Sequence, residues 1–349
     1  MLYDRQSLSK ILYYLQRVGD HNINLLRELS GVNNIEEILN ILKNEYNLLL
    51  VPMPRFNRIG LEFFHTIVKL ANRNIKPDDF YFFLNGLVIA ALKDSITPNT
   101  LILDIVSPTG KWAFIDVLDK LCEKEIIEDY EIYMEYDRRV YPIDFSKFNF
   151  NTLQFDENFI LDKPREPFSF PDLSDDFKPD WYDIMIIGKK QENPLRTWSI
   201  IGKDLGIGED EVIYHYYNHV IDKGLIESFY TYLGKIDFRI TLLINEVNEE
   251  VARELTRIPT VIRISNLHNE KIYSTIIGQN HMLLGILKFI NELSSNYKFT
   301  YEIYVHPITP QRDYVKVYSI PYEHFTKNGR WEIDSKELMY NLDKELTKL

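Results

Sequence analysis

The chain has 349 residues, with 40 Lys and Arg against 52 Asp and Glu, which gives a formal net charge of -12. Because 45% of the residues are hydrophobic and 13% aromatic, the composition excludes a disordered protein and suffices for two or more packed cores. The apolar runs fall far short of the roughly 18 residues that a membrane-spanning helix requires. No signal-peptide pattern opens the chain, and Cys122 is the only cysteine. We therefore expect a cytoplasmic protein without membrane contact or a cysteine-held metal.

Residues 1–58 predict a winged helix-turn-helix domain. Apolar residues recur at helical spacing in LSKILYYLQ, INLLREL and VNNIEEILNILKN, and a strand, LLLVPM, follows them. A buried stripe is expected from Leu29, Ile35, Ile38 and Leu42.

Residues 59–155 predict a domain in which strands and helices follow the order βαββαβ. The strands are FFHTIVKL, LVIAAL, TLILDIVS and EDYEIYMEY, with helices near DDFYFFLNG and over AFIDVLDKL. Four antiparallel strands backed by two helices make the ferredoxin-like arrangement.

Residues 156–181 are rich in proline and acid and predict an extended connector. A second winged helix-turn-helix is expected over 182–233, where Ile213, Tyr217 and Val220 form the predicted buried stripe and GLIESFYTYLG begins an extended hairpin. A second ferredoxin-like domain covers 234–330, with strands over 236–244, 261–265, 271–277 and 298–306. Residues 331–349 predict a C-terminal helix that packs through its leucines.

The two halves of the chain match each other at offsets of about 171 to 179 residues. YEIY recurs at 130–133 and 301–304, Gln16 aligns with Gln191, and Gly60 aligns with Gly234. We therefore predict an α+β protein with two winged helix-turn-helix and two ferredoxin-like domains in tandem, related by a pseudo-twofold axis.

This arrangement resembles the Lrp/AsnC family of prokaryotic transcription regulators. The resemblance rests on GIGEDEVIYHYYNHVIDKGLI with Leu233-Gly234, and on GVNNIEEILN with Ile59-Gly60. It implies a DNA-binding, non-enzymatic regulator in which one fused chain forms the pair that two chains form in the family. The turn between the second and third strands departs from the family's Gly-Asp pattern, so binding of a small-molecule effector stays open.

The charge distribution bears on DNA binding, because phosphate neutralisation supplies much of the affinity for DNA. Residues 1–58 carry seven basic and six acidic residues, whereas residues 178–233 carry six and nine. The acid is therefore concentrated outside the predicted DNA-binding domains, and neither of these is basic.

Exposed residues of the predicted recognition helices and wing are the candidate contacts with double-stranded DNA. They are Asn40, Lys43, Asn44, Arg55, Arg58, His215, Tyr216, Asn218, His219 and Lys223. The alternative is a scaffold whose winged helices bind proteins, such as the transcription machinery, or a second copy of the chain.

One possible zinc site is suggested by the spacing of Glu211, His215 and His219. Histidines that face solvent explain this spacing better. We therefore predict no metal, no cofactor and no catalytic residue. Paired Lrp/AsnC-like modules also form siroheme decarboxylases, and that enzymatic reading stays as a further alternative. The sequence shows no His, Tyr and Arg cluster that matches theirs.

Overall fold

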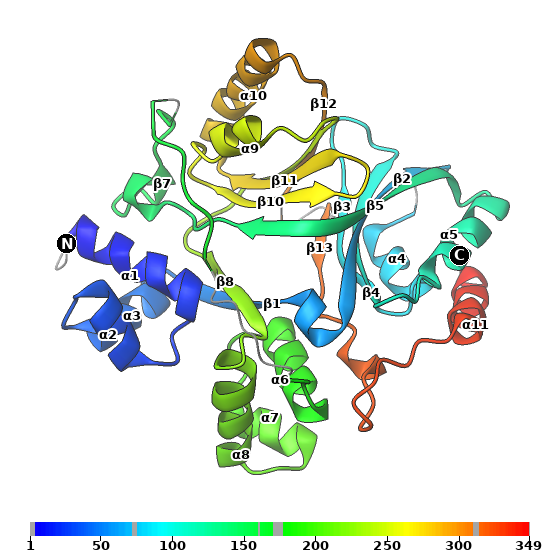
Figure 1. Cartoon of the computed structure of the whole chain (residues 1–349), viewed down its shortest axis with the longest axis horizontal. Helices are drawn as coiled ribbons and strands as arrows, with labels where there is room; N and C mark the ends of the chain where they lie inside the picture. Colours follow the sequence, from blue (N-terminus) through cyan, green and yellow to red (C-terminus); the bar gives the residue numbers. More distant parts are fainter. Residues whose placement is uncertain (1–3, 72–74, 160, 170–176, 310–313, 349) are drawn as a thin grey trace. The chain divides into compact units, whose positions relative to one another are not determined.

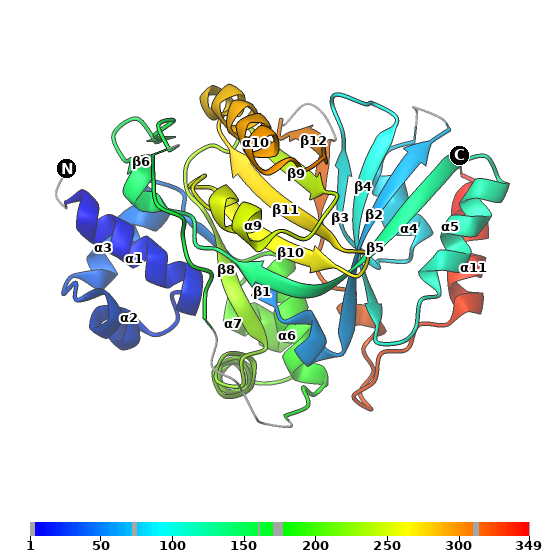
Figure 2. The same ribbon diagram turned by 45° about the horizontal axis from the view of Figure 1, so that its top comes forward.

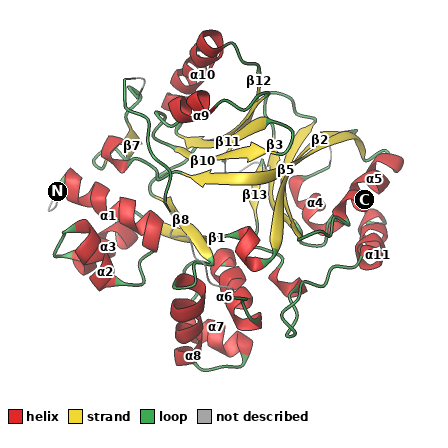
Figure 3. Ribbon diagram, viewed as in Figure 1, coloured by secondary structure: helices red, strands yellow, loops and turns green. Residues whose placement is uncertain are grey.

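The computed structural model describes residues 4–71, 75–159, 161–169, 177–309 and 314–348. It confirms an α+β fold (Figures 1 and 3). Contacts divide the chain into two compact units, each built from three segments. Unit 1 comprises Met1–Met53, Tyr136–Pro171 and Glu227–Val305, and unit 2 comprises Pro54–Glu135, Asp172–Ile226 and His306–Leu349. Residues 160 and 170–176 of the predicted connector lie outside the described residues.

Three helices open unit 1: α1 (Arg5–Val18), α2 (Ile23–Ser30) and α3 (Ile35–Asn44). Ile35, Ile38 and Leu42 of the predicted stripe are buried in one cluster, whereas Leu26 takes the place predicted for Leu29, which is half-buried. Strand β1 (Leu49–Pro54) pairs with β8 (Ile226–Tyr232) in a two-stranded sheet. The expected hairpin after residue 224 is therefore replaced by pairing between strands from the two halves of the chain.

Four strands and two helices form the core of unit 1. Its elements are β9 (Phe238–Ile244), α9 (Glu249–Leu255), β10 (Val261–Leu267), β11 (Lys271–Gly278), η4 (Asn280–Met282), α10 (Leu283–Tyr297) and β12 (Tyr301–Pro307). The sheet order is β12-β9-β11-β10. Helices α9 and α10 cover one face, where alternate apolar residues of the strands are buried (Figure 2).

The sheet of unit 2 has the corresponding strand order, β5-β2-β4-β3, with β13 beyond β3. Its elements are η1 (Phe56–Ile59), β2 (Leu61–Leu70), α4 (Pro77–Phe83), β3 (Val88–Lys93), β4 (Thr100–Pro108), α5 (Phe114–Glu123), β5 (Ile127–Val140) and β13 (Val315–Val317). Helices α4 and α5 pack on one face through Phe80, Phe83 and Phe114. The predicted C-terminal helix, α11 (Ser335–Leu346), joins the same core through Leu338 and Leu342.

Unit 2 also contains α6 (Trp181–Glu192), α7 (Trp198–Leu205), α8 (Glu209–Tyr214) and η3 (His215–Ile221), of which η3 is a π-helix. Asp180 and Asp183 form a reciprocal capping box at the start of α6. No described helix has the length and apolar character needed to cross a membrane.

Short elements follow the last strand of each sheet. They are η2 (Phe145–Lys147), β6 (Phe148–Asn149), β7 (Gln154–Phe155) and η5 (Tyr322–His324). The Gln16 side chain accepts a hydrogen bond from the Ile143 amide at 2.7 Å. Gln191 accepts one from the Ile320 amide at 3.0 Å. The same kind of bond thus recurs at Gln16 and Gln191, which the two halves align.

Replacing Gln16 with Leu is expected to lower the free energy of unfolding by about 2 kcal/mol, because it leaves the buried amide and carbonyl of Ile143 without their side-chain partners. Chemical unfolding of the variant beside Gln6→Leu, an exposed position on the same helix, measures the difference. Equal stability of the two variants would contradict the account.

Candidate active site

The predicted DNA contacts of α3 lie on the surface of unit 1. Asn40, Lys43 and Asn44 are exposed. The Lys43 ammonium forms an ion pair with Asp20 at 2.6 Å. The helix therefore presents little unpaired positive charge from these positions.

Arg55, Arg58 and Lys223 lie together in unit 2, and all three are half-buried. The Arg58 guanidinium donates to the carbonyl of Lys223 at 3.3 Å, and the Arg55 amide donates to the carbonyl of Leu225 at 2.8 Å. These contacts hold the start of η1 against the end of the π-helix segment.

The helix at 209–221 is rotated relative to the sequence prediction. His215 and Tyr216, expected to face outward, are only 8% and 5% exposed, and Asn218 alone of the predicted contacts there is exposed. Tyr216 packs against Trp198 of α7, with ring centroids 4.6 Å apart. The wider π-helical turn changes which residues share a face, so a stripe drawn for an α-helix is out of phase.

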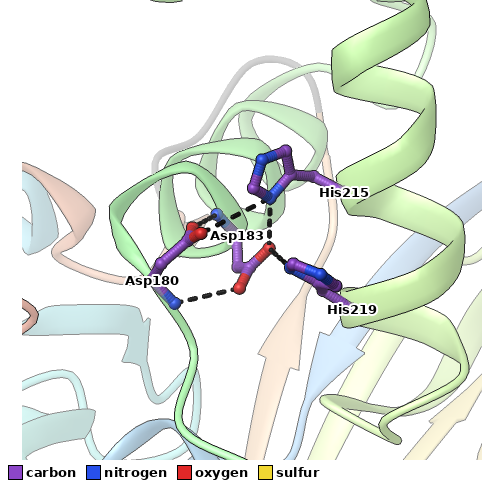
Figure 4. A group of neighbouring side chains, drawn as sticks. All are labelled: Asp180, Asp183, His215 and His219. Atoms are coloured by element: carbon purple, nitrogen blue, oxygen red, sulfur yellow. Dashed lines mark hydrogen bonds and ion pairs between the residues drawn. The ribbon is translucent and has the colours of Figure 1, made fainter.

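His215 and His219 turn inward toward the first turn of α6 (Figure 4). Their Nδ1 atoms lie 2.9 and 3.1 Å from Oδ1 of Asp183, which is fully buried. Burial raises the pKa of the Asp183 carboxyl, and its hydrogen bond with His215 opposes that rise. The reading of both histidines as solvent-facing is therefore wrong.

A third histidine lies in the middle of the unit 2 sheet, on the face opposite α4 and α5. His65 of β2 is paired in register with Asp104 of β4. Its Nδ1 lies 2.8 Å from Oδ1 of Asp104, and its Nε2 lies 3.3 Å from Oε2 of Glu135 on β5. The three side chains are 0%, 4% and 5% exposed, so the group is enclosed. Beside it, the Tyr133 hydroxyl donates to the carboxylate of Glu131.

An imidazole between two carboxylates can donate one hydrogen bond to each of them when both ring nitrogens carry a proton. The position of His65 therefore makes it a candidate to carry a transferable proton away from bulk water.

Unit 1 carries a different polar group on the face of its sheet opposite α9 and α10. Arg263 of β10, which is 3% exposed, donates to the hydroxyl of Thr275 at 3.3 Å. Its guanidinium lies 5.2 Å from the ring centroid of Tyr273. The Tyr273 and Thr241 hydroxyls lie 3.3 Å apart. A guanidinium held in this way is suited to a carboxylate.

An open cavity of about 730 Å³ lies in unit 1 between α1 and the segment after β5. Its walls include Arg5, Lys10, Tyr13 and Arg165. The Arg165 guanidinium donates its hydrogen bonds to backbone carbonyls. The cavity lacks a buried acid–base group, so it is a weaker candidate for chemistry than the cluster around His65.

The fold of this chain is similar to that of solved protein structures. No protein-family model matches the chain, and no curated protein sequence is significantly similar to it. The solved structure of the siroheme decarboxylase NirDL matches 97% of this chain and 99% of its own, with a TM-score of 0.52 and 15% identity. NirDL in complex with an iron-uroporphyrin III analogue matches 96% and 99%, with a TM-score of 0.52 and 14% identity.

These structures overturn the prediction of a non-enzymatic DNA-binding regulator. They share the fold along nearly the whole chain, and both are of an enzyme. They agree with the coarse resemblance to Lrp/AsnC architecture, whereas neither a family model nor a sequence relative supports a transcription regulator. The expectation that the chain is not an enzyme is wrong for the same reason.

His65, Asp104 and Glu135 are absent from the predicted site residues, although the sequence holds a signal for two of them. His65 and Asp104 each lie between apolar residues inside a predicted strand, FFHTIVKL and TLILDIVS. A charged or titratable residue inside such a strand is buried with it and requires a partner. Pairing the two strands in register would have brought His65 opposite Asp104.

Proposed function

We propose that the chain is a decarboxylase that acts on a carboxylate side chain of siroheme or a closely similar iron tetrapyrrole. One observation carries the proposal: a histidine buried between two carboxylates, in a chain that shares its fold from end to end with siroheme decarboxylase structures. The substrate class is inferred from the similarity of fold to siroheme decarboxylase. The proton transfer is inferred from the cluster of His65, Asp104 and Glu135.

We also propose the domain organisation that the sequence predicts. Winged helix-turn-helix domains would cover 1–58 and 182–233, ferredoxin-like domains 59–155 and 234–330, a connector 156–181 and a terminal helix segment 331–349. The two sheets share one strand order, in which the fourth strand lies beside the first and the third lies beside the second. That order and the repeated glutamine hydrogen bonds support a duplicated unit with pseudo-twofold symmetry.

Decarboxylation sets two physical requirements. The bond between the carboxylate carbon and its neighbouring carbon breaks, and its electron pair stays on the neighbouring carbon, from which the conjugated pyrrole system can withdraw it. CO2 leaves, and a proton must then form the new C–H bond. A donor that is shielded from water and positioned by fixed partners lowers the barrier to that step.

His65 is the proposed proton donor. Its ring is positioned from both sides, by Asp104 across the strand pair and by Glu135 on the next strand. After the ring gives up one proton to the substrate carbon, it is neutral and keeps one N–H for a carboxylate. A proton from solvent then restores it, so one proton is consumed for each CO2 released.

The test is an anaerobic incubation of the purified chain with siroheme, followed by mass spectrometry of the recovered tetrapyrrole. We expect a product lighter by one CO2 for each reacting side chain. An iron tetrapyrrole without carboxylate side chains, incubated in parallel, should be recovered unchanged. Recovery of intact siroheme from folded protein would refute the proposed function.

A further inference from the structure

We propose that Asp180, Asp183, His215 and His219 bind one divalent metal ion of the zinc class. The site belongs to α6 and η3 and involves none of the residues proposed for decarboxylation. Each of the four side chains offers one ligand atom, and these atoms all lie within 4.8 Å of one another (Figure 4).

Three of the six separations between the ligand atoms are close to the edges of a tetrahedron around one ion. Zinc binds nitrogen and oxygen at about 2.0 to 2.2 Å, so neighbouring ligand atoms are expected about 3.3 Å apart. The two imidazole Nδ1 atoms lie 2.9 and 3.1 Å from Oδ1 of Asp183. Nδ1 of His215 lies 3.6 Å from Oδ2 of Asp180. An ion at the centre would replace these direct contacts.

The backbone orients both carboxylates. Oδ1 of Asp180 accepts from the Asp183 amide at 3.0 Å, and Oδ2 of Asp183 accepts from the Asp180 amide at 2.9 Å. Each carboxylate thus has one oxygen fixed by the first turn of α6 and the other directed at the histidines. Outer bonds of this kind orient the ligands of metal sites.

Charge and ligand type select the ion. Two carboxylates with two neutral imidazoles carry two negative charges, which one divalent cation neutralises. Imidazole nitrogen favours zinc and its neighbours over magnesium or calcium, which prefer oxygen alone. The π-helix brings His215 and His219 to the same side, with ring centroids 4.8 Å apart.

The experiment titrates the full chain, first stripped with a chelator, with Zn²⁺ alone and with Co²⁺ alone. We expect one equivalent of Zn²⁺ to bind and to raise the melting temperature, because an ion that binds only the folded state stabilises it. Co²⁺ should give the visible absorption of a tetrahedral site. Absence of stoichiometric binding would overturn the proposal, whether or not siroheme is decarboxylated.

Variants locate the site. His219→Gln and Asp180→Asn change partly exposed side chains, so both are expected to fold. Each should lower the Zn²⁺ affinity at least about 100-fold, the upper end of what loss of an outer partner costs. His281→Gln, at an exposed position elsewhere, should bind as the unaltered chain does. Unchanged affinity in His219→Gln and Asp180→Asn would show that the four residues form only a hydrogen-bond network.

Discussion

Replacing His65 with Asn is expected to lower the rate of siroheme decarboxylation about 1,000-fold, within the range known for loss of a general acid. The amide can still bond to Asp104, but it cannot donate a proton to carbon at neutral pH. Binding of the tetrapyrrole, followed by its absorption spectrum, should change far less than the rate. This difference separates a lost proton donor from a lost binding site.

Two controls accompany that variant. His281→Gln removes an exposed imidazole and should leave the rate unchanged. Circular dichroism of His65→Asn should match that of the unaltered chain. A folded His65→Asn protein that decarboxylates at close to the original rate would remove His65 from the mechanism, even if siroheme remained the substrate.

Replacing Arg165 with Ala should lower the free energy of unfolding by about 3 kcal/mol. Its Nε donates to the Thr256 carbonyl at 2.7 Å, and Nη2 donates to the carbonyls of Ile258 and Val261 at 2.6 and 3.0 Å. Nη1 donates to the carbonyl of Pro142. Burial lowers the pKa of this guanidinium to about 10, so it remains charged at neutral pH. The alanine variant leaves several enclosed carbonyls without a donor.

Chemical unfolding of Arg165→Ala beside Arg27→Ala measures this effect. Arg27 lies on the surface of α2, where its ion pair with Glu36 at 4.0 Å is exposed and worth little. The free energy of unfolding of Arg165→Lys should lie between those of Arg165→Ala and Arg27→Ala, because an ammonium reaches fewer carbonyls than the planar guanidinium. Similar stabilities for all three variants would mean that these carbonyls find other donors.

The sequence predicts most of the secondary structure, because burial on one face imposes a clear period. Ile240, Leu242 and Ile244 alternate along β9, and Leu338 and Leu342 mark the buried side of α11. Pairing between β1 and β8 could not be predicted in the same way, since it joins strands about 177 residues apart and leaves no local pattern.

The candidate sites were harder to predict. One depends on which residues of neighbouring strands lie opposite each other, and the other depends on which side chains of the helix at 209–221 face inward. The stripe at Ile213 and Tyr217 assumes an α-helix, and the π-helical turn instead buries His215 and Tyr216. Asp183 precedes the histidines by about 30 residues, so only the packed structure brings it to them. The architecture alone does not decide the function, because one fold hosts several activities.

The most direct test of the central claim is decarboxylation in D2O, with the deuterium content of the recovered tetrapyrrole measured by mass spectrometry. We predict that each CO2 lost is accompanied by one deuterium bound to carbon, and that His65→Asn slows both changes together. If the folded chain returns siroheme with every carboxylate intact and no deuterium on carbon, the chain does not perform this reaction.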